Sequence, residues 1–92
     1  MSYTADEVRA LIEHWESFRY SDRIWIRVRY ADLTVAYDKL PTDLRATVLL
    51  HGLLRTPVRE AGASLGVSKS TVARRYDEAI EWMANYLSGS DY

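Results

Sequence analysis

The chain has 92 residues, of which 48% are apolar and 12% aromatic, and its formal net charge is −1. This length suits one domain with a modest core, and the apolar content excludes a disordered tail. No apolar run approaches the ~20 residues that span a bilayer, no signal-peptide pattern opens the chain, and the absence of cysteine excludes disulfides and thiolate metal sites. We therefore expect a folded cytoplasmic protein without a membrane segment.

The first predicted helix begins at Thr4, a capping residue that acidic side chains follow in the first helical turn. Apolar side chains then recur at helical spacing to about residue 19, where Ser21 and Asp22 interrupt the pattern. The stripe predicts a surface that faces the core or a partner. It carries no identifiable chemistry.

Residues 23–30 are ambiguous, because apolar and polar side chains alternate there as they do in a strand. However, no second strand-like run exists to pair with this one, and a lone strand would leave its backbone groups unsatisfied. A helical stripe fits the same region and is formed by Ile26, Tyr30, Leu33, Tyr37 and Leu40. We therefore favour one helix from about residue 22 to residue 39, with an intermolecular ribbon across a dimer as the alternative.

The next predicted helix starts at residues 40–43 and ends near Gly52. Its expected inner face is formed by Leu44, Val48, Leu49 and Leu53.

A helix-turn-helix is predicted between residues 56 and 80. Thr56 can cap a short helix with Pro57 at its first position, and Gly66 can adopt the left-handed conformation that ends it. Ser68 is a good N-cap for a second helix, which we expect to run from residue 69 to about residue 87 and to pack on the first helix of the chain. Apolar or small residues follow helical spacing in both helices: Val58, Ala61, Gly62, Leu65, Val72, Tyr76, Ala79 and Ile80. A purely structural helical hairpin is the alternative interpretation.

Residues 40–53 and 58–72 together resemble region 4 of the bacterial sigma factors, in a match that covers roughly residues 33–83. In that family the helix-turn-helix contacts the −35 promoter element. The class also includes small regulators, many of them encoded by phages of actinobacteria, and Arg74–Tyr76 with Trp82 looks most like those phage proteins. Nothing in the sequence resembles region 2, and Ala73 stands where many sigma factors carry a long polar side chain that faces the bases.

We therefore expect an all-α protein, a small helical bundle with a C-terminal helix-turn-helix of the sigma region 4 type. Residues 1–39 would form an N-terminal helical segment that completes the core or mediates dimerisation. Residues 40–88 would form the DNA-binding domain, and residues 89–92 a tail.

The predicted mode of binding places the second helix of the motif, about residues 69–80, in the major groove of double-stranded DNA. The expected base-reading residues are Lys69, Ser70, Ala73 and Arg74, with Arg74 as the candidate for a bidentate contact with guanine. The expected phosphate contacts are Arg55, Thr56, Arg59, Ser68, Thr71 and Arg75. Two alternatives stay open. Ser68 serves first as the N-cap of the helix and only second as a DNA contact, and Arg75 forms part of a solvated face or pairs with Asp77 or Glu78.

The distribution of charge supports this prediction more than the total does. Residues 40–76 carry six Lys or Arg side chains against two acidic ones, whereas residues 77–92 carry four acidic side chains and no Lys or Arg. Basic charge is therefore concentrated where the motif would meet a phosphate backbone.

Catalysis and cofactor binding are not expected. His14 and His51 are far apart, and neither has a partner at metal-ligand spacing. His51 is expected to cap a helix end, and no phosphate-binding loop or nucleophile elbow is present. We predict no enzyme activity, no metal and no cofactor.

Two functions and two kinds of partner remain. The protein is predicted to be a sequence-specific transcriptional regulator; the alternative is a protein-interaction module that engages RNA polymerase or a sigma factor with little DNA contact, which the weak net charge favours. A single module reads only a short half-site, so a dimer or a second protein is needed. An aromatic-rich segment could supply a homodimer interface or simply fill the core, and its members are Trp15, Phe18, Tyr20, Trp25 and Tyr30.

Overall fold

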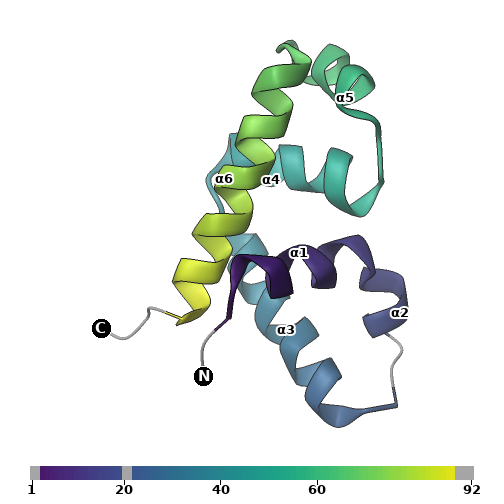
Figure 1. Ribbon diagram of the computed structural model, residues 1–92, viewed down its shortest axis with the longest axis vertical. Helices are drawn as coiled ribbons and strands as arrows, with labels where there is room; N and C mark the ends of the chain where they lie inside the picture. The colour runs from purple at the N-terminus through teal and green to yellow at the C-terminus, as the bar shows by residue number, and fades with distance from the viewer. Residues whose placement is uncertain (1–2, 20–21, 89–92) are drawn as a thin grey trace.

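The computed structural model describes residues 3–19 and 22–88, and every regular element in these residues is a helix (Figure 1). The elements are α1 (Ala5–Glu13), α2 (Trp15–Arg19), α3 (Ile24–Lys39), α4 (Thr42–Thr47), the π-helical turn η1 (Val48–Leu53), α5 (Val58–Leu65) and α6 (Lys69–Ser88). The predicted all-α helical bundle is confirmed. None of the helices in these residues is both long enough and apolar enough to cross a membrane.

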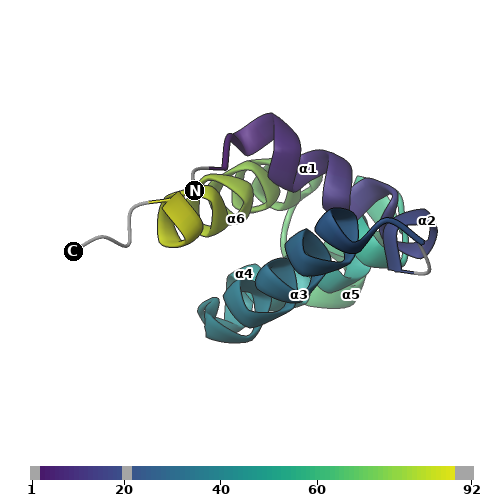
Figure 2. The ribbon, with the colours of Figure 1, turned by 90° about the horizontal axis from the view of Figure 1, so that it is seen from below.

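The long helix α6 organises the bundle, since α1, α3, α4, η1 and α5 all pack against it. Figure 2 shows α1 on one side of α6 and the pair α3 and α4 on the other. The buried face of α6 repeats at three- and four-residue spacing and consists of Val72, Tyr76, Ala79, Ile80, Met83 and Ala84. The predicted packing of the distal half of α6 on the first helix is confirmed.

One hydrophobic cluster joins the N-terminal helices to the rest of the chain. Val8, Leu11 and Ile12 from α1 lie in the same cluster as Leu33 and Ala36 from α3. The other members are Tyr3, Leu40, Leu44, Val48 and, from α6, Tyr76, Ala79, Ile80, Met83 and Ala84. The division of the chain near residue 39 stays a prediction, and the two predicted segments share this core.

Helix α1 begins at the residue that the sequence predicts, whereas it ends earlier than predicted. The Glu7 backbone N–H donates to Thr4 Oγ1 at 3.1 Å and the Thr4 N–H donates to the Glu7 carboxylate at 3.1 Å, a complete capping box. The predicted single helix to residue 19 is wrong, because it breaks at His14 (φ −121°, ψ 29°) and resumes as α2. The break turns the chain so that the Trp15 indole N–H can donate to the Leu53 carbonyl oxygen, 3.1 Å away.

Residues 24–30 of the ambiguous segment lie in α3 and Arg23 is its N-cap, so the helix prediction is confirmed and the intermolecular ribbon is wrong. The helix continues beyond this segment to Lys39 and buries Leu33 and Ala36 against the core.

The helix that begins at Thr42 departs from the prediction in its second half. Leu44 and Val48 are buried as expected, but Leu49 is exposed. The Leu54 N–H donates to the Leu49 carbonyl five residues earlier, as in a π-helical turn, and the buried residues of this turn are Val48 and Gly52.

The helical segment ends at Leu53, within one residue of the prediction, but Gly52 is not the helix stop that was predicted. It lies inside η1, buried, because two neighbours approach its backbone closely. A Cβ at this position would lie 2.7 Å from Ile12 Cγ2 and 2.9 Å from Tyr76 Cε1. Glycine is needed here for space and not for a helix stop.

Candidate nucleic-acid interface

The turn between α5 and α6 has the predicted geometry. Gly66 adopts a left-handed conformation (φ 72°, ψ 29°), and the Val67 N–H donates to the Gly62 carbonyl oxygen at 2.9 Å. Ser68 then caps α6, because its Oγ accepts from the Thr71 N–H at 3.1 Å. These two local contacts fix where the exposed end of α6 begins.

The predicted N-cap at Thr56 is wrong. Pro57 occupies the N-cap position of α5, and no side chain bonds to the free N–H groups there. The Thr56 backbone is used instead to close the preceding loop: its N–H donates to the Leu50 carbonyl at 2.8 Å, and its carbonyl accepts from His51 Nδ1 at 2.8 Å. His51 therefore bonds a backbone carbonyl just after η1, and its ring also meets the Tyr76 ring edge-on at 4.9 Å.

The predicted base-reading residues share one end of α6. The side chains of Lys69, Ser70, Ala73 and Arg74 are all exposed on its first two turns. The opposite face of the same turns is held in the protein by buried Val72 and Tyr76. Arg74 Nη1 lies 4.0 Å from Glu78 Oε1, and this exposed pair is weak enough to exchange its carboxylate for another acceptor.

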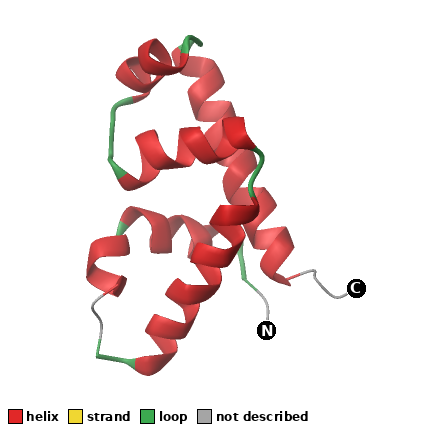
Figure 3. Cartoon of the chain, turned by 180° about the vertical axis from the view of Figure 1, so that it is seen from behind, coloured by secondary structure: helices red, strands yellow, loops and turns green. Residues whose placement is uncertain are grey.

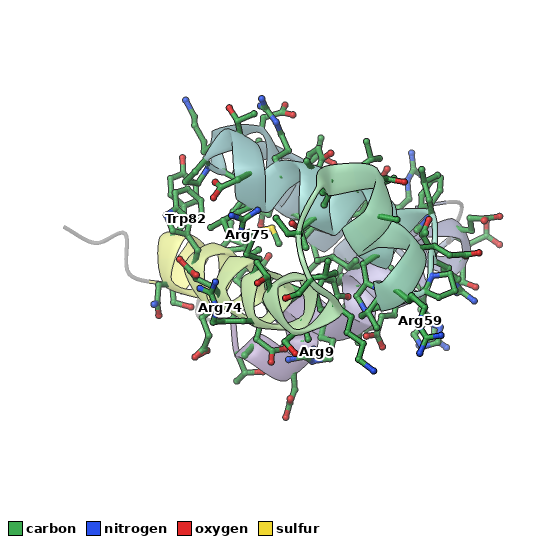
Figure 4. The ribbon with its side chains drawn as sticks, turned by 90° about the horizontal axis from the view of Figure 1, so that it is seen from above. Arg9, Arg59, Arg74, Arg75 and Trp82 are labelled. Carbon is green, nitrogen blue, oxygen red and sulfur yellow. The ribbon has the colours of Figure 1, made fainter. Side chains whose placement is uncertain are left out.

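Of the six predicted phosphate-contacting residues, three lie on α5, the turn or the start of α6, two are engaged within the protein, and the backbone of Thr56 closes the preceding loop. Arg59 and Ser68 are exposed and Thr71 is half-buried beside the turn. Figure 4 looks onto the end of the molecule formed by α5 and the start of α6, and shows Arg59 and Arg74 on opposite sides of it.

Two predicted phosphate contacts are engaged within the protein. The Arg55 guanidinium donates to the Glu13 carbonyl oxygen at the end of α1, and Arg55 itself has a positive φ of 56°. Arg75 Nε lies 3.9 Å from Asp43 Oδ2, so the ion pair considered as an alternative for Arg75 exists with α4 and not with its own helix. Contact of either arginine with phosphate stays a prediction.

Arg9 is a residue that the sequence analysis missed. Its Nη2 lies 3.3 Å from Asp77 Oδ1, and its guanidinium carbon lies 5.7 Å from the centre of the Tyr76 ring. Figure 4 shows Arg9 and Arg75 on opposite sides of α6. No local pattern could reveal Arg9, because the residues it contacts lie on a helix at the other end of the chain.

Acidic side chains limit how much of α6 suits a phosphate backbone. Asp77, Glu78 and Glu81 are exposed on the turns that follow Arg74. Arg9 and Arg74 offset the first two of these charges, and Glu81 has no ion pair with the described residues. The electrostatically favourable surface therefore ends after about two turns of α6.

The described residues also contain no group of three His, Asp or Glu side chains that could hold a metal ion.

Comparison with known proteins identifies one relative. Over 58 residues the chain is 38% identical to the ECF RNA polymerase sigma factor SigE of Mycolicibacterium smegmatis. This chain contains a sigma-factor-like region. The aligned stretch covers 63% of this chain and 23% of the relative, so the chain spans less than a quarter of that protein's length. No family model and no solved structure matches the chain.

A stretch of 58 residues in a chain of 92 necessarily contains residues 35–58, so the aligned part includes α4 and η1.

Proposed function

We propose that this protein is a regulator of transcription that binds double-stranded DNA sequence-specifically, with the first two turns of α6 in the major groove. The observation that carries the proposal is the exposed set Lys69, Ser70, Ala73 and Arg74 on a helix end that Ser68 caps and buried Val72 and Tyr76 anchor. The similarity to a protein named as an RNA polymerase sigma factor supports a role in transcription. By its resemblance to phage proteins, we place it among the small regulators of the sigma-like class.

Arg74 is the proposed specificity residue. Its guanidinium presents paired donors that match guanine O6 and N7, and its present partner, Glu78, is exposed. Ser70 and Lys69 would read neighbouring base edges, and the Ala73 methyl group would contact a thymine methyl.

Arg59, Ser68 and Thr71 would position the protein on the phosphates, together with the backbone N–H groups at the start of α6. Arg55, Thr56 and Arg75 are secondary candidates. Arg55 and Arg75 would have to give up the Glu13 carbonyl and the Asp43 carboxylate, respectively.

The acidic turns of α6 and the net charge of −1 favour a second candidate function. In that case the sigma-like region engages RNA polymerase or a sigma factor and makes little contact with DNA. The two functions differ in salt dependence, because neutralising phosphates gives a steep salt slope in binding to random DNA.

The test separates base reading from phosphate binding. A site is first selected from a random DNA pool, and Arg74→Ala and Arg59→Ala are then titrated against that site and a scrambled one at several salt concentrations. We expect Arg74→Ala to lose ~1–3 kcal/mol on the selected site and to relax preference at one base pair. We expect Arg59→Ala to weaken both sequences alike and to lower the salt slope by about one unit.

Lys39→Ala is the matched control, since it removes one exposed positive charge at the C-terminal end of α3, outside both helices of the motif. It should leave both the affinity ratio and the salt slope unchanged. If Arg74→Ala keeps the full ratio, the recognition helix is not docked as proposed. If the wild-type protein enriches no sequence and neither variant alters DNA affinity, the interaction module is the correct function.

A further inference from the structure

The helix α3 is apolar on two opposite faces. One face packs into the core through Leu33, Ala36 and Leu40. On the other face lies a second stripe, at spacings of four, three and four residues, that consists of Ile24, Val28, Ala31 and Val35. Ile24 is 74% exposed, Val28 47% and Val35 50%, and Ala31 is exposed between them. We call these four residues the α3 stripe.

Exposed apolar side chains concentrate on this helix. Of the seven large hydrophobic side chains that are exposed in the described residues, four belong to α3: Ile24, Trp25, Val28 and Val35. Seen from behind, α3 lies in front of its neighbours, and it occupies the end of the molecule far from α5 (Figure 3). A contiguous apolar surface of this kind marks an interaction site, and the position of α3 leaves the helix-turn-helix unobstructed.

The charges beside the stripe indicate what covers it. Arg27 and Asp38 are both exposed, and neither side chain has an ion pair or hydrogen bond with the described residues. They are eleven residues apart, which is about three helical turns, so both lie on the same flank of the stripe. One helix therefore carries an unpaired positive charge and an unpaired negative charge in line, at opposite ends of one apolar surface.

We propose that α3 pairs antiparallel with α3 of a second copy of this chain across a two-fold axis. This arrangement brings Arg27 of each copy against Asp38 of the other, and Val28 against Val35, because contacts in a two-fold interface are reciprocal. Ala31 lies near the axis, where its small side chain lets the helices approach. A parallel two-fold pairing would instead leave Arg27 of one copy about three helical turns from Asp38 of the other, so neither ion pair could form.

The size of the surface predicts a weak dimer. With 16 residues, α3 is about 24 Å long. A contact between two such helices buries less than the ~800 Å² per partner of a standard interface. Association should therefore depend on concentration in the micromolar range. The proposal does not rest on DNA binding, although a two-fold dimer would present two recognition helices and favour palindromic sites.

Sedimentation velocity over a micromolar concentration series tests the pairing. We expect the mass of the wild-type protein to rise from monomer to dimer, and Val28→Glu to remain monomeric throughout. Leu54→Glu is the matched control, because Leu54 is 60% exposed but lies outside α3. It should dimerise as the wild type does. Circular dichroism checks that each variant retains its helix content.

A charge swap tests the antiparallel register. Arg27→Glu and Asp38→Arg should each raise the dimer dissociation constant roughly tenfold, since two ion pairs become repulsive in every dimer. The double variant restores opposite charges and should return to within about threefold of the wild type. A wild-type monomer at all concentrations would overturn the proposal and assign the α3 stripe to a different protein. Disruption by Leu54→Glu, or failure of the double variant to restore dimerisation, would overturn it as well.

Discussion

Gly62 holds the helix-turn-helix at its closest point, and adding a single methyl group there should destabilise the protein. A Cβ at this position would lie 2.6 Å from the Val67 carbonyl oxygen and 3.3 Å from the Ser68 carbonyl carbon. These atoms belong to the turn backbone, which cannot rotate away as a flexible side chain can. Gly62→Ala therefore has to move the turn by several tenths of an ångström.

Two effects of opposite sign decide the magnitude. Replacing glycine with alanine inside a helix stabilises by about 1 kcal/mol. Overpacking costs ~1–3 kcal/mol, and the upper part of that range applies because the contact is with backbone. The expected net loss is about 2 kcal/mol for Gly62→Ala, which in a domain of this size lowers Tm by roughly 8–16 °C. Gly62→Leu should lose more or fail to fold.

Thermal unfolding followed by circular dichroism measures this loss, with two controls from the same motif. Ala63 is exposed beside Gly62, so Ala63→Gly changes helix propensity alone and should cost about 1 kcal/mol. A Cβ added at Gly66 would meet no atom within 4 Å. Gly66→Ala therefore reports only the strain of the positive φ, ~1–2 kcal/mol. A Tm for Gly62→Ala at or above that of the wild type would refute the close crossing.

Two further predictions concern stability. Ser68→Ala should cost about 1 kcal/mol by loss of the cap on the Thr71 N–H. Ser70→Ala removes an exposed hydroxyl that makes no cap contact in the described residues, and should change stability by less than about 0.5 kcal/mol in the same melts. Burial, together with the Asp32 and Glu13 carboxylates, raises the pKa of Tyr3 and Tyr76 from 10.0 to about 12. The unfolded chain ionises these phenols first, so the stability they contribute is complete below pH 10 and is lost as the pH rises toward 12. Tyr76→Phe should flatten the fall of Tm over that range, and an unchanged pH dependence would contradict this assignment.

Local signals in the sequence predicted the parts of the fold that local interactions determine. The Thr4 capping box, the left-handed Gly66 and the Ser68 cap each involve residues within four positions of one another. The buried stripe of α6 follows helical spacing and was predicted for the same reason. The Ser68 cap fixes where α6 begins and the buried stripe fixes which face is turned inward, so together they predict which side chains are exposed on its first turns.

Contacts between distant segments account for what the sequence could not predict. Helix α1 breaks at His14 while Trp15 bonds the Leu53 carbonyl, and Gly52 is a glycine because Ile12 and Tyr76 approach it. A glycine can serve a turn or a close approach, and the local pattern at Gly52 was the same for both.

The candidate site shows the same limit. Exposure of Arg59 and Arg74 could be expected from their helical positions. The partners of Arg55 and Arg75 could not, because the Glu13 carbonyl and the Asp43 carboxylate come from other helices.

The continuity of α6 connects the core to the candidate DNA-binding surface. With 20 residues, α6 is about 30 Å long, and it crosses the protein without a break. Its distal turns bury Ile80 and Met83 completely against the core that α1 and α3 share. Because a helix transmits orientation along its length, the packing of these distal turns sets the direction in which Arg74 and its neighbours project. The N-terminal helices therefore help to set the orientation of the candidate DNA-binding surface. They do so through apolar packing, to which Arg9 of α1 adds an ion pair with Asp77 of α6.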